Sequence, residues 1–418
     1  MWTGVAGYVG LCADPDMALN NLQSFAALLA SEEPYLDLFR KNKTLIPTLA
    51  DIFSRSEYLS KTIMKRSEYL ELIGHEMFSK KSLTRLKKEL GETVTSGMSL
   101  SDSTRIIRQH EEICLGILFL ERTIDVTMLV RGLSRTAEAV VSVCTDELTK
   151  SSFAVIGMGK AGGRELTFGS DLDLIFVCKD ESADNHTRSA ERLIGLLTSY
   201  TKNGIAYRVD MRLRPDGAKG SLISTLLALR HYYSSAAQFW EFQALLKARP
   251  MSGEKTTGRC FMVMREEVLK SKGREVSASD IRAMRERILR ELSKEKDGYD
   301  LKLGPGGISE LEFTIQYLQL VNCAGHAGLL VQGSLDAIRK LASAGVIDLK
   351  DADAMRAAYV FYRTLESFLR LRGESILLKT GTAIEEASDF MGYRGSDEFL
   401  RALEKKRTFV KDVFVKYV

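Results

Sequence analysis

The chain has 418 residues, 45% of them hydrophobic and 27% charged, which suits a folded protein with large cores and excludes a disordered or fibrous one. Its 59 basic and 55 acidic residues leave a formal net charge of +4, which gives no strong field to indicate nucleic acid or a membrane surface as a partner. The start of the chain lacks a basic segment, and no apolar run of about eighteen residues occurs, so we expect a cytoplasmic protein without a membrane span.

The six cysteines are widely scattered, with no CxxC pair and no histidine at ligand spacing. This pattern predicts reduced thiols and no zinc site. The cysteines are Cys12, Cys114, Cys144, Cys178, Cys260 and Cys323.

The first third of the chain has apolar residues at helical spacing, from about residue 16 to residue 148. Asp14 precedes Pro15 where the first helix should begin, which is typical of an N-terminal cap. Residues 1–149 are therefore predicted to form a helical scaffold. The expected helices after the first are 45–52, 58–64, 69–78 and a longer one, which a break could divide, over 102–148.

A change to strand-like patterns begins near Ser151. Short β-branched and aromatic runs predict strands over 151–157 and 171–178, and an alternating run predicts a third over 205–215. An amphipathic helix over 182–204, ending at Asn203-Gly204, should separate the second strand from the third. We expect a compact sheet domain over 150–250 and a helical domain over 251–418, with helices at 277–295, 306–320, 351–371 and 397–418.

A glycine-rich turn follows the first predicted strand, in FAVIGMGKAGGRELTFGSDLDLIFV. A P-loop is excluded because Lys160 is followed by Ala161 rather than by Ser or Thr. Gly157, Gly159 and Gly162 have the spacing of a dinucleotide-binding fingerprint. Two aspartates on a strand about a dozen residues later disfavour that reading, which stays a minority alternative.

Paired carboxylates carry the stronger signal. A strand period of two puts Asp171 and Asp173 on one face, with Leu172 and Leu174 in the core. Asp210 has the same phase in the third predicted strand. Carboxylates on one face repel each other unless a cation neutralises them or one of them takes up a proton. Hard oxygen ligands suit magnesium, so the pattern, together with the glycine turn, indicates metal-assisted phosphoryl transfer. The plainer alternative is a turn residue at position 171 and a simple arginine pair at position 210.

Basic and acidic residues near these motifs allow two interpretations each. Arg208, Arg212 and Arg214 share a strand face with Asp210, and they either bind a triphosphate or form ordinary ion pairs. Further along, a helix N-terminus at Gly306-Gly307 with Glu310 and Glu312 either shapes a pocket or is only a helix start. Four residues on a predicted helix either reach the site or are a packing tryptophan with ordinary surface charges. They are Trp240, Glu241, Lys247 and Arg249.

Four ordered segments resemble one family. They are GMGKAGGRELTFGSDLDLIFV, YRVDMRLRPDGAKGSL, WEFQALLKARP and LKLGPGGISELEFTIQYL, and they are similar to the glutamine synthetase adenylyltransferase (glutamate–ammonia-ligase adenylyltransferase) family. The N-terminal segments ADPDMALNNLQSF and FSRSEYLSKTIMKRSEYLELI also resemble its helices. The resemblance implies an α+β fold with a polymerase-β-like nucleotidyltransferase domain, a small mixed sheet with helices, between an N-terminal helical region and a C-terminal helical bundle.

The same resemblance implies the chemistry. Asp171, Asp173 and Asp210 would ligate two magnesium ions, and AMP would pass from ATP to a tyrosine of glutamine synthetase with release of pyrophosphate. Asp210 would help to deprotonate that tyrosine. Glutamine synthetase is the implied protein substrate, and a PII-type signal protein is a candidate partner. The residues expected to lie against the nucleotide are Gly157, Gly159, Lys160, Gly162, Ser170, Arg212 and Arg214.

The chain carries one copy of the glycine turn and the D-x-D pair, whereas family members are usually tandem proteins with a removing half and a transferring half. DGAKGSL and WEFQALLKAR are more like the transferring half, whereas RVDMRLRP is like the removing half. We expect transfer of AMP. Phosphorolytic removal of AMP, giving ADP, is the first alternative, and a non-catalytic module that senses glutamine or a PII-type protein is the second.

Overall fold

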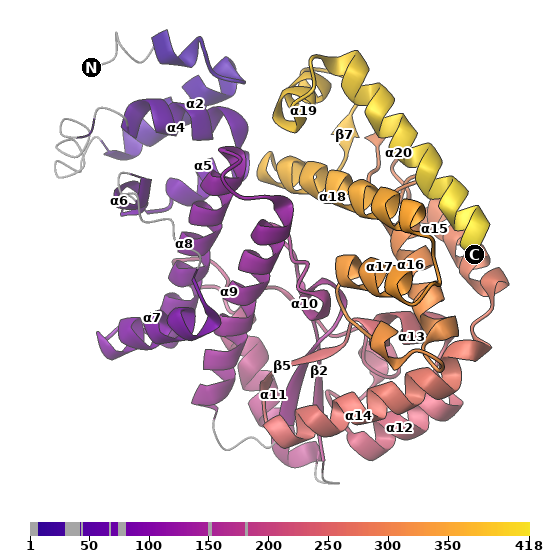
Figure 1. Cartoon of the computed structure of the whole chain (residues 1–418). Coiled ribbons are helices and arrows are strands. Elements are labelled where there is room, and N and C mark those ends of the chain that lie inside the picture. Colours follow the sequence, from indigo (N-terminus) through magenta and orange to yellow (C-terminus); the bar gives the residue numbers. More distant parts are fainter. Residues whose placement is uncertain are drawn as a thin grey trace.

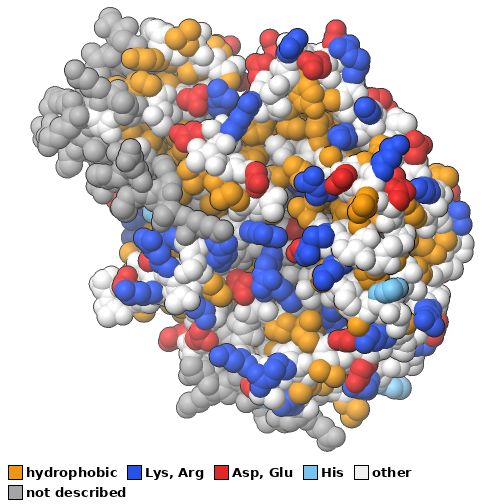
Figure 2. Space-filling view, viewed as in Figure 1, with side chains coloured by type: hydrophobic (Ala, Val, Ile, Leu, Met, Phe, Trp, Pro, Cys, Tyr) orange, Lys and Arg blue, Asp and Glu red, His pale blue; other side chains and the backbone are white. Residues whose placement is uncertain are grey.

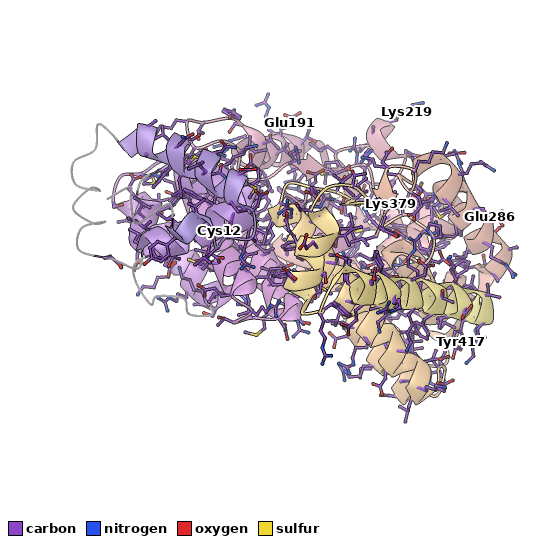
Figure 3. The ribbon with its side chains drawn as sticks, turned by 90° about the horizontal axis from the view of Figure 1, so that it is seen from above. Cys12, Glu191, Lys219, Glu286, Lys379 and Tyr417 are labelled. Atoms are coloured by element: carbon purple, nitrogen blue, oxygen red, sulfur yellow. The ribbon has the colours of Figure 1, made fainter. Side chains whose placement is uncertain are left out.

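The computed structural model describes residues 7–29, 42, 45–66, 68–73, 81–148, 153–179 and 183–418. N-terminal helices stand on one side of the molecule and C-terminal helices on the other, and a small sheet lies between their lower ends (Figure 1). Seen from above, the N-terminal helices near Cys12 and the end of the last helix near Tyr417 lie on opposite sides (Figure 3). The predicted α+β fold with a small mixed sheet is confirmed.

The N-terminal region is helical, as expected. The first helix begins at Pro15, where Asp14 Oδ1 accepts a hydrogen bond from Met17 N at 2.9 Å, so the predicted cap is confirmed. The predicted long helix divides at residues 121–125, because Asp125 caps a new helix by accepting from Met128 N at 2.8 Å. Of the expected helix over 69–78, the structure describes Tyr69–Ile73 as helical, and residues 74–78 lie outside the described residues. The helices are α2 (Pro15–Leu29), α4 (Leu45–Arg55), α5 (Glu57–Ile63), α6 (Tyr69–Ile73), α7 (Leu83–Thr95), α8 (Leu100–Leu120) and α9 (Val126–Glu147).

The sheet has the order β3-β2-β1-β5, and β4 also pairs with β2. β1 is antiparallel to β2 and to β5, whereas β3 and β4 run parallel to β2, so the sheet is mixed. The strands are β1 (Phe153–Gly157), β2 (Leu172–Cys178), β3 (Val209–Asp210), β4 (Ile223–Thr225) and β5 (Arg249–Gly253). The first two predicted strands are confirmed. The predicted domain boundary at residue 250 falls within β5, and the domain division itself stays a prediction.

Two expectations in this region are wrong. The third strand covers only Val209–Asp210, because Asp210 Oδ1 accepts from Arg212 N at 2.9 Å and Arg214 N donates to Met211 O, which turns the chain away from the sheet. The helix α11 (Ala183–Thr198) ends before Asn203-Gly204, which instead belongs to a tight turn closed between Thr201 and Gly204.

The C-terminal region is mainly helical, with a two-stranded pair of β6 (Gly298–Tyr299) and β7 (Leu377–Leu378). The four helices expected there are confirmed as α15, α16, α18 and α20, with shifted ends. The helices after β4 are α12 (Leu226–Ser235), α13 (Phe239–Leu246), α14 (Lys255–Lys272), α15 (Ala278–Leu292), α16 (Ile308–Asn322), α17 (Ser334–Ser343), α18 (Leu349–Leu371), α19 (Ala383–Met391) and α20 (Ser396–Tyr417). None of the described helices is both long and apolar enough to cross a bilayer.

The sheet separates two hydrophobic cores, and strand alternation assigns its residues to them. Leu172 and Leu174 face the larger core, which the N-terminal helices share with α16 to α20. Ile175 and Val177 face the second core, formed largely by α12, α13 and α14. Asp173 has the phase of this second set and lies near the start of β2.

Candidate active site

Two aspartates from neighbouring strands face each other at one edge of the sheet. β2 and β3 run parallel, and their register places Asp173 directly opposite Asp210. Desolvation, together with the negative charge of Asp210, raises the pKa of the Asp173 carboxyl to about 6. The two carboxylates thus lie side by side, and their repulsion makes this edge of the sheet suitable for a cation, while their role as a metal site stays a prediction.

Asp171 and Asp210 each contact an arginine with an exposed side chain. Arg208 Nε lies 2.7 Å from Asp171 Oδ1, and Arg212 forms two-point contacts with Asp210, with its Nη2 2.5 Å from Oδ2. Hydrogen bonds from Arg212 hold the pKa of Asp210 below its ordinary range. Such exposed pairs are weak, so a bound cation could replace either arginine. Within the described residues, no three Asp, Glu, His or Cys side chains are arranged to hold a metal ion.

Gly159 lies directly against the Asp173 carboxylate. Its φ is +48°, and a Cβ atom there would lie 2.3 Å from Asp173 Oδ2. Any side chain at this position would displace the carboxylate. Gly157 and Gly162 serve a different purpose, because Cβ atoms there would meet Met251 Sδ at 2.5 Å and Lys247 O at 2.0 Å. Gly157 leaves room for Met251 of β5 and Gly162 for the backbone of Lys247 at the end of α13, and the contact of both glycines with a nucleotide stays a prediction.

Lys160, expected beside the nucleotide phosphates, has its own carboxylate partner. Its Nζ lies 2.8 Å from Glu366 Oε1 on α18 and 3.4 Å from Thr167 Oγ1. Ser170 closes the turn before β2, because its Oγ accepts from Thr167 N at 3.0 Å. Phosphate binding by Lys160 and Ser170 stays a prediction, and Lys160 would have to leave Glu366 to reach a ligand.

Arg214 also has local partners. Its guanidinium donates to the carbonyl oxygens of Met211, Ala218 and Gly220 at 2.9–3.1 Å, which braces the loop after β3. The alternation of Arg212 and Arg214 on one strand face is wrong, because the strand ends at Asp210. Of the three arginines considered for the triphosphate, Arg208 and Arg212 have largely exposed side chains, whereas that of Arg214 is only partly exposed.

Lys247 and Arg249 are buried, which corrects the view that they are surface charges. Lys247 Nζ lies between Glu165 Oε2 at 2.6 Å and Glu312 Oε1 at 2.8 Å. Arg249 Nη2 lies 2.8 Å from Glu138 Oε2, and its Nε donates to Gly162 O at 3.0 Å. Both residues hold the back of the glycine turn rather than lining the site.

The remaining candidates are structural. Glu241, on α13 with Trp240, accepts from Tyr232 Oη and from Gln238 N at 2.8 Å, so it caps its own helix. Gly307 caps α16, and Glu310 Oε2 accepts from Arg285 Nη2 at 2.7 Å. The pocket interpretation of the α16 N-terminus has no support from these contacts.

The sequence did not predict the buried charged residues that support the turn. They are the acids Glu165 and Glu366 and the base Arg363. Arg363 Nη1 lies 2.7 Å from Glu366 Oε2, and its Nη2 lies 3.0 Å from Glu312 Oε1. A weak signal was present for Glu366, since a charge in the apolar run TLESFLRL of a long helix needs a buried partner.

Comparisons with known proteins agree with the motifs. A protein-family model described as glutamate-ammonia ligase adenylyltransferase matches residues 46–263, and one described as GlnD PII-uridylyltransferase matches residues 281–418. The bifunctional glutamine synthetase adenylyltransferase/adenylyl-removing enzyme of Streptomyces coelicolor is 30% identical over 87% of this chain and 38% of its own length. The protein of the same name from Nitrosococcus oceani is 30% identical over 94% of this chain and 44% of its own length. The one from Mycobacterium leprae is 27% identical over 97% of this chain and 44% of its own length.

The chain spans less than half the length of the curated relatives that it matches. The first family match covers just over half of the chain and includes the glycine turn, Asp173 and Asp210. Together with the resemblance of the motifs, this match shows that the chain belongs to the glutamate-ammonia ligase adenylyltransferase family.

Proposed function

We propose that this chain transfers AMP from ATP to a tyrosine hydroxyl of glutamine synthetase, with magnesium, in a polymerase-β-like nucleotidyltransferase domain. The observation that supports it best is the Asp173–Asp210 pair at the sheet edge, beside a glycine that leaves the carboxylate uncovered. The relatives, whose names include glutamine synthetase adenylyltransferase, supply the substrate class.

The donor set fits magnesium. Asp173 and Asp210 are hard oxygen ligands that repel each other, and Asp171 lies two residues before Asp173 at the surface. Magnesium takes one or two protein carboxylates and completes its shell with water and phosphate oxygens. When bound, it would neutralise charge on the phosphates. We propose that Asp171, Asp173 and Asp210 hold two such ions, with Arg208 and Arg212 released from their carboxylates.

The reaction is a displacement at phosphorus. The tyrosine oxygen attacks the α-phosphorus of ATP, a new O–P bond forms, and the bond from the α-phosphorus to the α,β-bridging oxygen breaks. Pyrophosphate leaves with the bonding electrons. The hydroxyl proton passes to Asp210, whose carboxylate is ionised at neutral pH. The backbone turn around Gly159 positions the triphosphate, and such positioning accounts for much of the catalysis of phosphoryl transfer.

The direct test measures transfer of labelled AMP to glutamine synthetase by the unsubstituted chain and by Asp173→Asn. We expect loss of transfer by a factor of about 100 or more, because the proposed metal ligand is removed. Asp353→Asn is the matched control, since Asp353 is an exposed residue of α18. Wild-type transfer by Asp173→Asn, with the fold intact by circular dichroism, would exclude this mechanism.

The removing direction is tested with the same preparation, because the relatives carry both activities in their names. Adenylylated glutamine synthetase is incubated with phosphate, and release of ADP is measured. ADP release without formation of pyrophosphate in the forward assay would favour removal over transfer. Failure of the chain to bind Mg-ATP in calorimetry would favour the non-catalytic sensing module.

A PII-type protein is proposed as a regulatory partner. The supporting observation is the match of residues 281–418 to a family described as PII-uridylyltransferase. Co-purification of the chain with a PII-type protein, with and without glutamine, tests it. Absence of a complex in both conditions would exclude this partner. A cytoplasmic location stays a prediction from the sequence.

A further inference from the structure

Lys302 lies on a braced turn between β6 and α16, in the segment LKLGPGG. Asp300 Oδ1 accepts from Lys302 N at 3.1 Å and from Leu303 N at 2.9 Å. Ser309 N donates to Lys302 O at 3.0 Å. These bonds fix the backbone, while the side chain itself is exposed. Lys302 is therefore a flexible cation on a rigid support.

The turn carrying Lys302 borders the candidate active site. Lys302 and Glu366 line the same pocket, of about 120 Å³. Glu366 binds Lys160, and Lys160 follows Gly159, against which the Asp173 carboxylate lies. The C-terminal region thus contributes a positive charge to the edge of the sheet.

The other cations near the two aspartates have partners in the structure, and the proposed magnesium would displace only those of Arg208 and Arg212. Lys160 is bound to Glu366, and Arg212 is bound to Asp210. Arg208 is bound to Asp171, and Arg214 donates to three backbone carbonyls. Lys302 has no carboxylate partner within the described part of the chain. Figure 2 shows Lys and Arg side chains gathered near the middle of one face, between the N-terminal and the C-terminal helices.

We propose that Lys302 binds the triphosphate of ATP, so that the helical region after the sheet domain completes the nucleotide site. An ammonium on a flexible stem suits phosphate as a point charge, and it would offset the negative charge that grows on the leaving pyrophosphate. This inference rests on the proposed function for the identity of the nucleotide. It adds the side chain that contacts the β- and γ-phosphates.

The test compares Lys302→Met, Lys302→Arg and Lys296→Met in the full chain. Lys296 is an exposed lysine six positions earlier that does not line the pocket. Calorimetry measures the Kd for Mg-ATP and for AMP, which lacks the β- and γ-phosphates. We expect Lys302→Met to weaken Mg-ATP binding about tenfold or more, with AMP binding changed less than about twofold. Lys302→Arg should stay within about threefold of the unsubstituted chain, and Lys296→Met should not differ from it.

The outcomes separate this inference from the proposed function. Unchanged Mg-ATP affinity in Lys302→Met would overturn the role of Lys302 alone. Equal weakening of ATP and AMP binding would also overturn it, because the effect would then not depend on the outer phosphates. Lys302-dependent ATP binding without any transfer to glutamine synthetase would overturn the proposed function and leave the phosphate contact standing. Absence of Mg-ATP binding by the unsubstituted chain would overturn both.

Discussion

Lys160 and the buried Glu366 form an ion pair, with Nζ 2.8 Å from Oε1, that connects the glycine turn to α18. Glu366 is only 7% exposed and also binds Arg363 at 2.7 Å. Burial alone would raise the pKa of Glu366, but the positive charges of Lys160 and Arg363 hold it far below its ordinary value. The position of the turn beside Asp173 therefore depends on a residue of the C-terminal region.

Glu366→Gln should lower the free energy of unfolding by about 3–5 kcal/mol, because it leaves two buried cations without their shared carboxylate. Urea denaturation at pH 7 measures this loss. Glu267→Gln, at an exposed pair with Arg230, is the matched control and should cost about 1 kcal/mol or less. Since the folded pKa of Glu366 is depressed, the difference from the unsubstituted chain should shrink as the pH falls below about 4.5. Equal losses for both variants would contradict this account.

Asp173→Asn should stabilise the protein in the absence of metal while removing activity. The folded pKa of Asp173 is raised from 3.8 to about 6, so its ionised form is disfavoured in the folded state. That stabilising preference for the protonated form is complete below about pH 4 and is lost as the pH rises through 6. The variant should therefore gain about 1–3 kcal/mol relative to the unsubstituted chain at pH 8 and nothing at pH 4. Thermal melts in EDTA at the two pH values measure this difference in stability. A variant that is destabilised at pH 8 would contradict the unfavourable desolvation and repulsion assigned to the Asp173 carboxylate.

Magnesium should stabilise the unsubstituted chain at pH 8, because the ion binds the folded state and relieves the repulsion between Asp173 and Asp210. At about 100 times its Kd, a ligand adds roughly 2.7 kcal/mol to the free energy of unfolding. The expected result is a higher melting temperature in magnesium than in EDTA, and no such difference for Asp173→Asn. A magnesium effect of the same size in the variant would place the ion elsewhere.

Local pattern was sufficient to predict β1, β2 and the core phase of Leu172 and Leu174, since alternation along a single strand depends only on neighbouring residues. The sequence also predicts that Asp171, Asp173 and Asp210 belong to one group of carboxylates, but the register that pairs Asp173 with Asp210 follows only from the folded sheet. The length of β3 was not predicted either, because its end is set by a hydrogen bond from Arg212 N to Asp210 that competes with the sheet. The strands β4 and β5 were not predicted, because they are too short to show an alternating pattern of apolar and polar residues.

The partners of the basic residues could not be predicted from the sequence. The family resemblance implies that Lys160 lies near the ATP phosphates, yet its carboxylate partner, Glu366, lies 206 positions away in the sequence. Lys247 has the same kind of remote partner, Glu312, on a helix that meets it only in the folded chain. A charge in the sequence indicates that a partner is needed, but the tertiary fold decides which one.

A comparison of Gly159→Ala with Gly169→Ala separates the loss of stability caused by the backbone conformation from the loss of AMP transfer caused by a displaced Asp173. Gly159 has φ +48°, which costs a non-glycine residue about 1 kcal/mol, and its Cβ would also lie 2.3 Å from Asp173 Oδ2. Gly169→Ala is the matched control, because Gly169 has φ +67° with no atom within 4 Å of a Cβ. Both variants should lose similar stability in urea denaturation. Only Gly159→Ala should lose AMP transfer, by about 100-fold, since a displacement of about 1 Å at a reacting centre has that effect. Equal activities in the two variants would mean that the Asp173 carboxylate does not need the space that Gly159 leaves.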